Sequence, residues 1–158
     1  MSEASVQKLS PQRAVSAVLK QPNQEQIEDA TACFATDFRY QDHGIGLEFR
    51  DKERLAEFFR KARELYPDYF VQADHTLVGG DYVVTEWTLK ATFTEPFYSA
   101  LSRKVPISLH GASIVRIENG KITDWADYYD GLTSPHTALS SLDFRVPRDR
   151  VLSQCASQ

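Results

Sequence analysis

The sequence has little cysteine, no long apolar run and no excess of basic charge. Its two cysteines, Cys33 and Cys155, stand far apart, so neither a disulfide framework nor a cysteine-ligated metal is predicted. No window approaches the roughly 18 apolar residues of a membrane span, and the N-terminus lacks an apolar signal core. We therefore expect a cytoplasmic protein with no membrane partner. The formal net charge of −4 argues against nucleic acid as a partner.

Motifs that hold cofactors or metals are missing as well. There is no glycine-rich dinucleotide loop, phosphate loop or nucleophilic serine elbow. The four histidines are scattered, with none placed one helical turn from another. We therefore expect no cofactor and no metal. Aromatic residues are plentiful, however, with nine Phe, seven Tyr and two Trp available for a core or a cavity wall.

Helical signals fill the first part of the chain. Ser10-Pro11 is typical of a helix start, and this helix should end near Pro22. A second helix is predicted from about Gln24, with apolar residues at helical spacing as far as Phe34. After a short strand within FRYQDHGIG, Asp51 caps an amphipathic helix that a proline stops at residue 67.

From residue 69 onward the apolar period becomes two, which predicts strands over 69–78, 81–94, 105–118 and 121–130. Helices followed by long antiparallel strands indicate one α+β domain, over residues 10–133. Residues 1–9 are predicted to be frayed, and residues 134–158 to be a partly docked extension. A curved sheet covered on one face by these helices would enclose an elongated cavity.

Four segments in order are FATDFRYQDHGIG, a helix ending ELYPDY, GGDYVVTEWTLKATFTEPF and IVRIENGKITDW. From about Pro11 to Asp130 they resemble the SnoaL-like polyketide cyclase branch of the nuclear transport factor 2-like superfamily. The resemblance implies a cone-shaped α+β fold, with a curved, mostly antiparallel sheet wrapped around the N-terminal helices. It also implies an interior pocket for a small hydrophobic ligand, and a homodimer.

The resemblance implies site residues too. Catalytic members of the branch use a histidine on the penultimate strand and an acidic residue after GKI-x, which are His110 and Asp124 here. Asp42-His43 matches a pair that lies at the pocket mouth. At two positions the chain departs from the family pattern: Phe93 stands where a histidine is usual, and Glu86 where an arginine is usual. The substrate of the family is therefore not carried over to this chain.

Asp124 is the predicted base. It alternates with Ile122, Ala126 and Tyr128 on one strand face, where partial desolvation would raise its pKa and make it a better base near neutrality. The competing interpretation is a solvated aspartate on the outer face of an edge strand.

Whether His110 shares the face of Asp124 depends on the turn between their strands. A two-residue Asn119-Gly120 turn pairs Glu118 with Lys121 and places His110 on the opposite side from Asp124. A three-residue loop places both on the same side. Even then they would be separated by roughly 13 Å along the strands, so they would contact different parts of one substrate.

Further candidates surround these two. His43 lies in YQDHGIG, where glycines suit a bend near a pocket, although a surface-loop histidine is the alternative. Aromatic side chains that could line a cavity, or could simply be core, are Tyr40, Trp87, Phe93, Trp125 and Tyr128.

Three functional hypotheses follow. The first is a cofactor-independent acid–base enzyme of the cyclase, isomerase or dehydratase type, acting on a small hydrophobic, polyketide-like carbonyl compound. The second is a limonene-type epoxide hydrolase that recruits Arg116, Asp124 and Asp127, although strand alternation places the two aspartates on opposite faces. The third is a non-catalytic module for ligand binding or dimerisation.

Overall fold

The computed structural model describes residues 10–20, 24–94 and 104–131. The elements are α1 (Pro11–Leu19), α2 (Gln24–Ala32), β1 (Phe34–Asp42), β2 (Leu47–Phe49), α3 (Lys52–Leu65), β3 (Phe70–Gly79), β4 (Tyr82–Thr94), β5 (Lys104–Glu118) and β6 (Lys121–Tyr129). The predicted α+β class is confirmed. Segments 1–9 and 134–158 lie outside the described residues, and their predicted states stay predictions.

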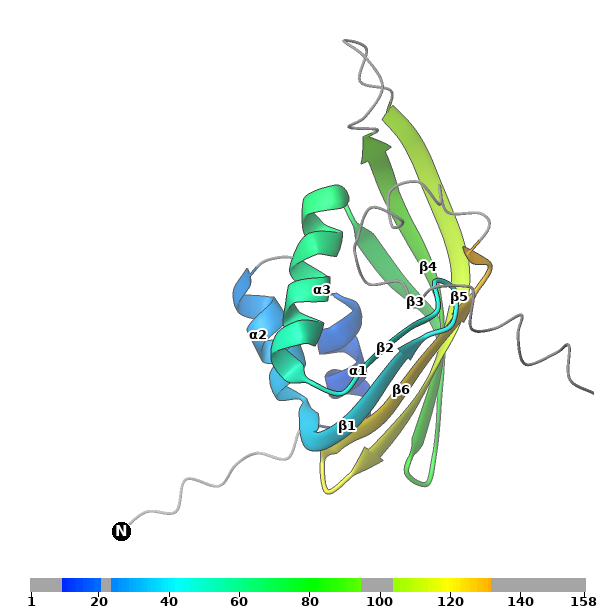
Figure 1. Ribbon diagram of the computed structural model, residues 1–158. Coiled ribbons are helices and arrows are strands. Elements are labelled where there is room, and N and C mark those ends of the chain that lie inside the picture. The colour runs from blue at the N-terminus through cyan, green and yellow to red at the C-terminus, as the bar shows by residue number, and fades with distance from the viewer. Residues whose placement is uncertain (1–9, 21–23, 95–103, 132–158) are drawn as a thin grey trace, which may run out of the picture.

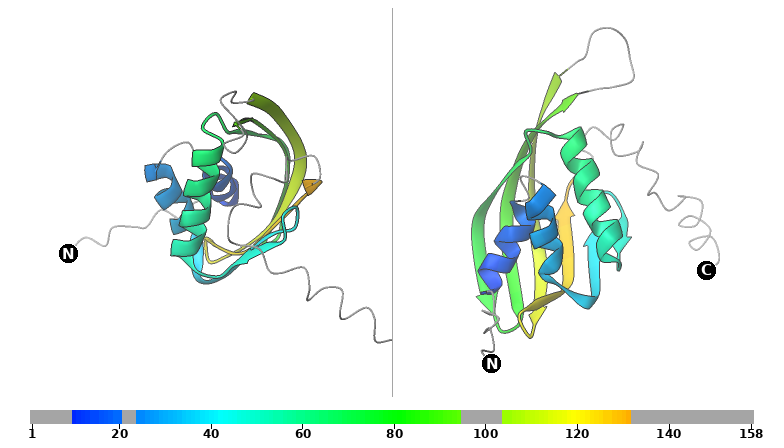
Figure 2. Two further views of the ribbon diagram at one scale, coloured as in Figure 1. Left: turned by 45° about the horizontal axis from the view of Figure 1, so that its top comes forward. Right: turned by 90° about the vertical axis from the view of Figure 1, so that its left-hand side faces the viewer.

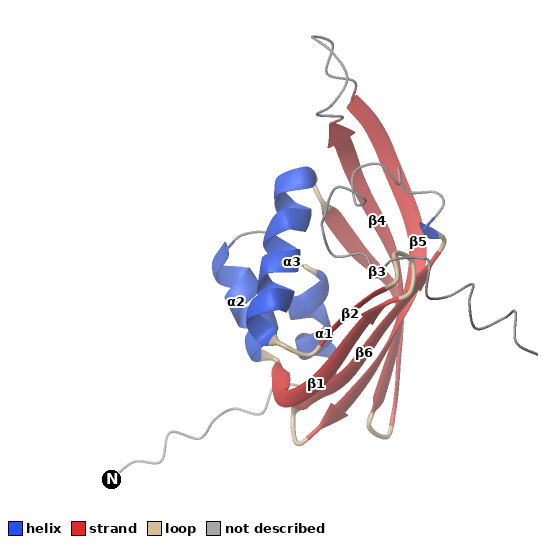
Figure 3. Ribbon diagram, in the orientation of Figure 1, coloured by secondary structure: helices blue, strands red, loops and turns tan. Residues whose placement is uncertain are grey.

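The six strands form one curved sheet in the order β2-β1-β6-β5-β4-β3 (Figure 1). All neighbours are antiparallel except β1 and β6, which pair in parallel, so the mostly antiparallel prediction is confirmed. The helices pack on the concave side of the sheet, as Figure 2 shows from two directions. Figure 3 shows the same separation of helices from strands by colour.

Local signals explain where the helices begin. The Ser10 hydroxyl accepts a hydrogen bond from the backbone N–H of Arg13 at 3.4 Å, and proline occupies the first turn of α1. The Asp51 carboxylate accepts one from the N–H of Arg54 at 2.9 Å and caps α3. α3 buries Leu55, Ala56, Phe58 and Phe59 against the concave sheet face. In the described residues, no helix is long and apolar enough to cross a bilayer.

The predicted extension of the second helix to Phe34 is wrong. Phe34 is the first residue of β1, and its side chain is fully buried against the rings of Phe38 and Trp125. An apolar residue at helical spacing after Ala30 is compatible with either state. Phe34 adopts the strand conformation because pairing with β6 buries its side chain. The short strand β2 was not predicted.

The β5–β6 hairpin contains the feature that sets the faces of β6. Asn119 and Gly120 have φ values of 53° and 77°, and Glu118 pairs with Lys121, so the predicted two-residue turn is confirmed. The register then shifts, because Ile117 pairs with Ile122 but Arg116 pairs with Asp124. Thr123 is therefore the extra residue of a β-bulge.

This bulge reverses the alternation along β6. Ile122 is buried before it, and Trp125 and Asp127 are buried after it. Asp124 and Tyr128 consequently face the outer, convex side of the sheet. The residues that β6 offers to the interior are therefore the odd-numbered ones after position 124.

Candidate functional site

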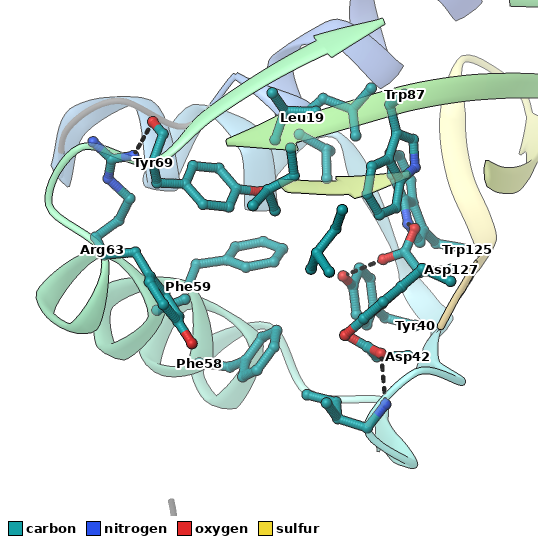
Figure 4. A pocket seen from close by; sticks show the side chains of 18 of the residues that line it. Leu19, Tyr40, Asp42, Phe58, Phe59, Arg63, Tyr69, Trp87, Trp125 and Asp127 are labelled. Carbon is teal, nitrogen blue, oxygen red and sulfur yellow. Dashed lines mark hydrogen bonds between the residues drawn. The ribbon is translucent and has the colours of Figure 1, made fainter. Parts of the chain in front are cut away.

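A hydrophobic cavity of about 120 Å³ lies between helices α1 and α3 and the concave face of the sheet. Most of its wall is aliphatic or aromatic (Figure 4). The lining residues are Val18, Leu19, Tyr40, Asp42, Ile45, Phe58, Phe59, Ala62, Arg63, Tyr66, Tyr69, Val71, Trp87, Leu89, Ile107, Leu109, Trp125, Asp127 and Tyr129. The two carboxylates in this set, Asp42 and Asp127, are neighbours in the register of β1 and β6.

Asp127 is a buried carboxylate surrounded by hydrogen-bond donors, and only 8% of the residue is exposed. Its Oδ1 accepts from Ser113 Oγ at 2.5 Å and from Trp125 Nε1 at 2.6 Å. Its Oδ2 accepts from the Tyr40 hydroxyl at 2.6 Å. Burial raises the pKa of Asp127, while these three donors oppose the rise because they favour the ionised form.

Ser113 on β5 extends this network across the sheet to Trp87 on β4. Its hydroxyl proton is donated to Asp127, and its oxygen accepts from Trp87 Nε1 at 2.9 Å. Trp87 has room for this position because Gly111 carries no side chain: a Cβ there would lie 2.5 Å from the indole ring. The network therefore positions both tryptophans of the chain around one carboxylate.

Asp42 ends β1, and only 6% of it is exposed. Its Oδ2 accepts from the Tyr129 hydroxyl at 3.1 Å, and its Oδ1 accepts from the backbone N–H of Ile45 at 3.1 Å. Burial and, next, the charge of Asp127 raise the pKa of Asp42 from 3.8 to about 7. Since Asp42 has fewer side-chain donors than Asp127, we expect Asp127 to ionise first and Asp42 to titrate near neutrality.

The opposite end of the cavity carries a different pair. The Tyr69 ring points into the cavity, and Arg63 lies beside it, away from the carboxylates (Figure 4). Arg63 Nη1 donates to the Tyr69 carbonyl oxygen at 2.9 Å, and the guanidinium carbon lies 5.4 Å from the ring centroid. Burial, then the charge of Asp127, raise the pKa of the Tyr69 hydroxyl, which therefore stays protonated at neutral pH.

The predicted interior position of Asp124 is wrong. Its side chain is 37% exposed, does not line the cavity, and forms an ion pair with Arg39 at 3.2 Å on the outer face of the sheet. The cause is the bulge at Thr123, which separates Asp124 from the face of Ile122.

His110 also lies on the outer face, where it is exposed and its Nδ1 is 3.1 Å from Thr88 Oγ1. It therefore shares the side of Asp124 after all, despite the two-residue turn, because of the same bulge. Six residues of β5 separate His110 from Arg116, the partner of Asp124. That spacing is about 20 Å, so the structure does not bring the two predicted catalytic residues together.

The remaining predicted residues divide into two groups. Tyr40, Trp87 and Trp125 line the cavity. His43 and Tyr128 do not: both are exposed, and their rings stack at 4.5 Å on the outer surface. The side chain of Phe93 lies outside the described part of the structure.

The set proposed for epoxide hydrolysis is not assembled. Arg116 lies on the outer face with Asp124, whereas Asp127 lies inside, as strand alternation predicted. No group of three or more His, Cys, Asp or Glu side chains in the described ranges could hold a metal ion.

Sequence reasoning missed Asp127 as the central acid and Tyr69 altogether, and it treated Asp42 only as part of a pair with His43. One signal was available for Asp42, since it precedes a glycine-rich turn. Tyr69 follows the helix-stopping Pro67, where no pattern distinguishes an inward from an outward ring.

Comparison with known proteins places this geometry in context. A family model described as a SnoaL-like domain matches residues 15–125. No curated protein matches the chain in sequence.

Solved structures with the same fold are numerous. A protein of ketosteroid isomerase-like fold from Catenulispora acidiphila, in complex with trimethylamine, is 21% identical, with a TM-score of 0.63 over 77% of this chain and 87% of that one. A protein named as a SnoaL-like polyketide cyclase from Shewanella putrefaciens is 12% identical, with a TM-score of 0.66 over 82% and 96%. One from Streptomyces galilaeus, named as a hydroxylase, is 15% identical, with a TM-score of 0.60 over 93% and 92%. At these identities the likeness concerns the fold alone.

Proposed function

This chain belongs to the SnoaL-like domain family, and from that premise and its cavity we propose that it is a cofactor-independent acid–base enzyme acting on a small hydrophobic carbonyl compound. The observation that carries the proposal is Asp42, a carboxyl group inside an apolar cavity whose pKa is raised to about 7. A base that titrates near the operating pH combines a useful ionised fraction with a strong tendency to take a proton.

Asp42 would remove a proton from a carbon next to the carbonyl and return it elsewhere. Asp127 already accepts hydrogen bonds from three donors, so we assign it to tuning Asp42 rather than to reacting itself. Proton transfer by a positioned side chain contributes about 10²–10⁴-fold to a rate. Cyclisation, isomerisation and dehydration all start with this step.

Tyr69 is the donor that we assign to the developing enolate oxygen. Its hydroxyl points into the cavity (Figure 4) and donates to no other described residue. The Tyr40 and Tyr129 hydroxyls already donate to carboxylates and are less suited to this role. A donor aimed at a developing oxyanion adds about 10²–10³-fold.

The cavity also restricts the substrate. At about 120 Å³ it is somewhat smaller than the engineered cavity of about 150 Å³ that accommodates benzene. A single ring or a short branched ketone matches this volume.

Exchange of the α-protons of cyclopentanone in D₂O, followed by NMR, tests the proposal without knowledge of the natural substrate. We expect the wild type to accelerate exchange with a rate that rises with pH up to about 7. Asp42→Asn and Tyr69→Phe should each lose about 10²-fold or more. Asp124→Asn is the matched control and should exchange as the wild type does. Full activity in Asp42→Asn would refute the assignment.

A non-catalytic ligand-binding module is the second candidate. It is favoured by the Catenulispora acidiphila protein, which has the same fold and was solved in complex with trimethylamine. A co-purified ligand that is released unchanged, together with no exchange activity at any pH, would support this candidate over the enzyme.

We also propose that the outer sheet face pairs two copies of the chain. Large apolar side chains on this face are exposed, which is unusual away from interaction sites. They are Leu77, Tyr82, Ile114 and Tyr128, exposed by 71%, 49%, 41% and 47%. Sedimentation should give a dimer for the wild type and a monomer for Ile114→Arg, and a monomeric wild type would exclude the pairing.

A further inference from the structure

The two interior carboxylates have only neutral hydrogen-bond partners. Among the described residues, no lysine, arginine or histidine forms an ion pair with Asp42 or Asp127. The charge of exposed His43 lowers the pKa of Asp127 slightly, and the cation that lines the cavity, Arg63, is held at the far end by Tyr69. Holding an ionised carboxylate in an apolar interior without a counter-ion costs free energy. A cation bound at this end of the cavity would reduce that cost.

The aromatic wall at the same end complements that charge. Tyr40 and Trp125 donate to Asp127, and Tyr129 donates to Asp42, so their polar atoms are already engaged. Trp87 is engaged in the same way by Ser113, which itself donates to Asp127. With their polar edges occupied, these rings offer a ligand mainly their π surfaces, which attract cations within about 6 Å.

We propose that the carboxylate end of the cavity binds a small alkylammonium ion, with its charge beside Asp42 and its alkyl groups against the aromatic rings. An alkylated ammonium suits this wall better than a bare one, because few hydrogen-bond acceptors besides the carboxylates are present. This inference goes beyond the proposed reaction, since it requires binding but no turnover.

Binding of such a cation should depend on pH through Asp42. The titratable groups around Asp42 are Asp127 and Tyr129 on β6, Tyr40 on β1 and Tyr69 ahead of β3. Exposed His43, the next residue in the chain, acts on Asp127, and Arg63 on α3 lies at the far end of the cavity. The residues of α1 in the wall, Val18 and Leu19, are apolar. Because a cation favours ionised Asp42, affinity should fall as the pH drops below 7, toward the roughly tenfold loss expected of Asp42→Asn, and be constant above pH 7.

Tetramethylammonium is the probe, because its charge does not change with pH. Tert-butyl alcohol, a neutral tetrahedral molecule with the same number of heavy atoms, is its control. Both tryptophans of the chain line the cavity, so tryptophan fluorescence reports occupancy directly. At pH 8 the wild type should bind the cation on the order of tenfold more tightly than the alcohol.

The variants separate the interior charge from surface charge. Asp42→Asn should lose about tenfold in affinity for the cation and bind the alcohol unchanged, whereas Asp124→Asn should bind both as the wild type does. Equal affinity for cation and alcohol, or equal weakening by the two variants, would overturn the inference. If Asp42→Asn does not fold, the pH profile of the wild type decides, and a profile that is flat from pH 5 to 8 counts against the inference.

The two proposals fail in distinguishable ways. Tetramethylammonium binding without cyclopentanone exchange removes the reaction and leaves the cation site. Exchange that proceeds with no cation binding removes only the cation site.

Discussion

Replacing Asp42 by asparagine should make the protein more stable at pH 8, although it removes the charge of a buried residue and weakens its hydrogen bonds. In the wild type the folded-state pKa of about 7 lies above the ordinary value of 3.8. The folded protein therefore holds a proton that the unfolded chain has already released. Stability is highest below the ordinary pKa and falls as pH rises to about 7.

The size of the effect follows from that pKa. A rise from 3.8 to about 7 corresponds to about 4 kcal/mol, of which about 3 kcal/mol is lost between pH 5 and 8. Asparagine does not ionise, so it avoids this loss, but its hydrogen bonds to Tyr129 and Ile45 are weaker by about 1 kcal/mol in total. We expect a net gain at pH 8 of about 2–3 kcal/mol, or about 5–10 °C in Tm.

Denaturant unfolding of the wild type and Asp42→Asn at half-unit steps from pH 5 to 8 measures this directly. The two curves should lie close together at pH 5 and diverge toward pH 8. Asp127, whose pKa is also raised by burial, leaves a slope of the same sign in the variant. Asp124→Asn keeps every interior group, and since it loses only an exposed ion pair with Arg39 it should follow the wild type within about 1 kcal/mol.

Two results would refute the reasoning. One is a wild type whose stability does not fall between pH 5 and 8. The other is an Asp42→Asn variant that is less stable than the wild type at pH 8, which would mean that the ionised carboxylate of Asp42 is well solvated or paired.

Two substitutions and one deletion test the supports of the site. Ser113→Ala leaves the Trp87 N–H without its acceptor and removes a donor from Asp127, so it should cost about 2–4 kcal/mol in denaturant unfolding; a cost below 1 kcal/mol would contradict the network. Gly111→Ala brings a Cβ to within 2.5 Å of the Trp87 ring, and should lower Tm and shift the tryptophan emission, whereas an unchanged spectrum would show that the ring moves freely. Deleting Thr123 would remove the bulge and leave Ile122, Trp125 and Asp127 on the interior face of a regularly alternating strand, so the shortened chain should keep a cooperative melt, and loss of that melt would contradict the bulge assignment.

The parts of the fold that sequence predicts well are those with local causes. Asp51 caps a helix with its own side chain, and Asn119-Gly120 adopts the positive φ values that a two-residue hairpin turn needs. Phe34 was misplaced because its state depends on partners far away in the chain, which helical spacing cannot reveal.

The bulge explains why the wrong aspartate was chosen. With the confirmed turn and no bulge, Asp124 would stand opposite buried Val115 and would face the interior. One extra residue reverses every later side chain of the strand. A glycine or asparagine at this position would have suggested a bulge, but Thr123 is neither, so the sequence does not indicate the extra residue.

The acid pair itself depends on a contact that no local pattern specifies. Asp42 and Asp127 become neighbours only because β1 and β6 pair in parallel, although the two residues are 85 positions apart in the chain. The donors that hold Asp127 come from three strands, through Tyr40 on β1, Ser113 on β5 and Trp125 on β6 itself. Taken alone, each of these residues is typical of an ordinary core or strand position. Their chemistry arises from the sheet order, and a one-residue change in the register of β6 would expose Asp127 to solvent and leave the cavity without an acid pair.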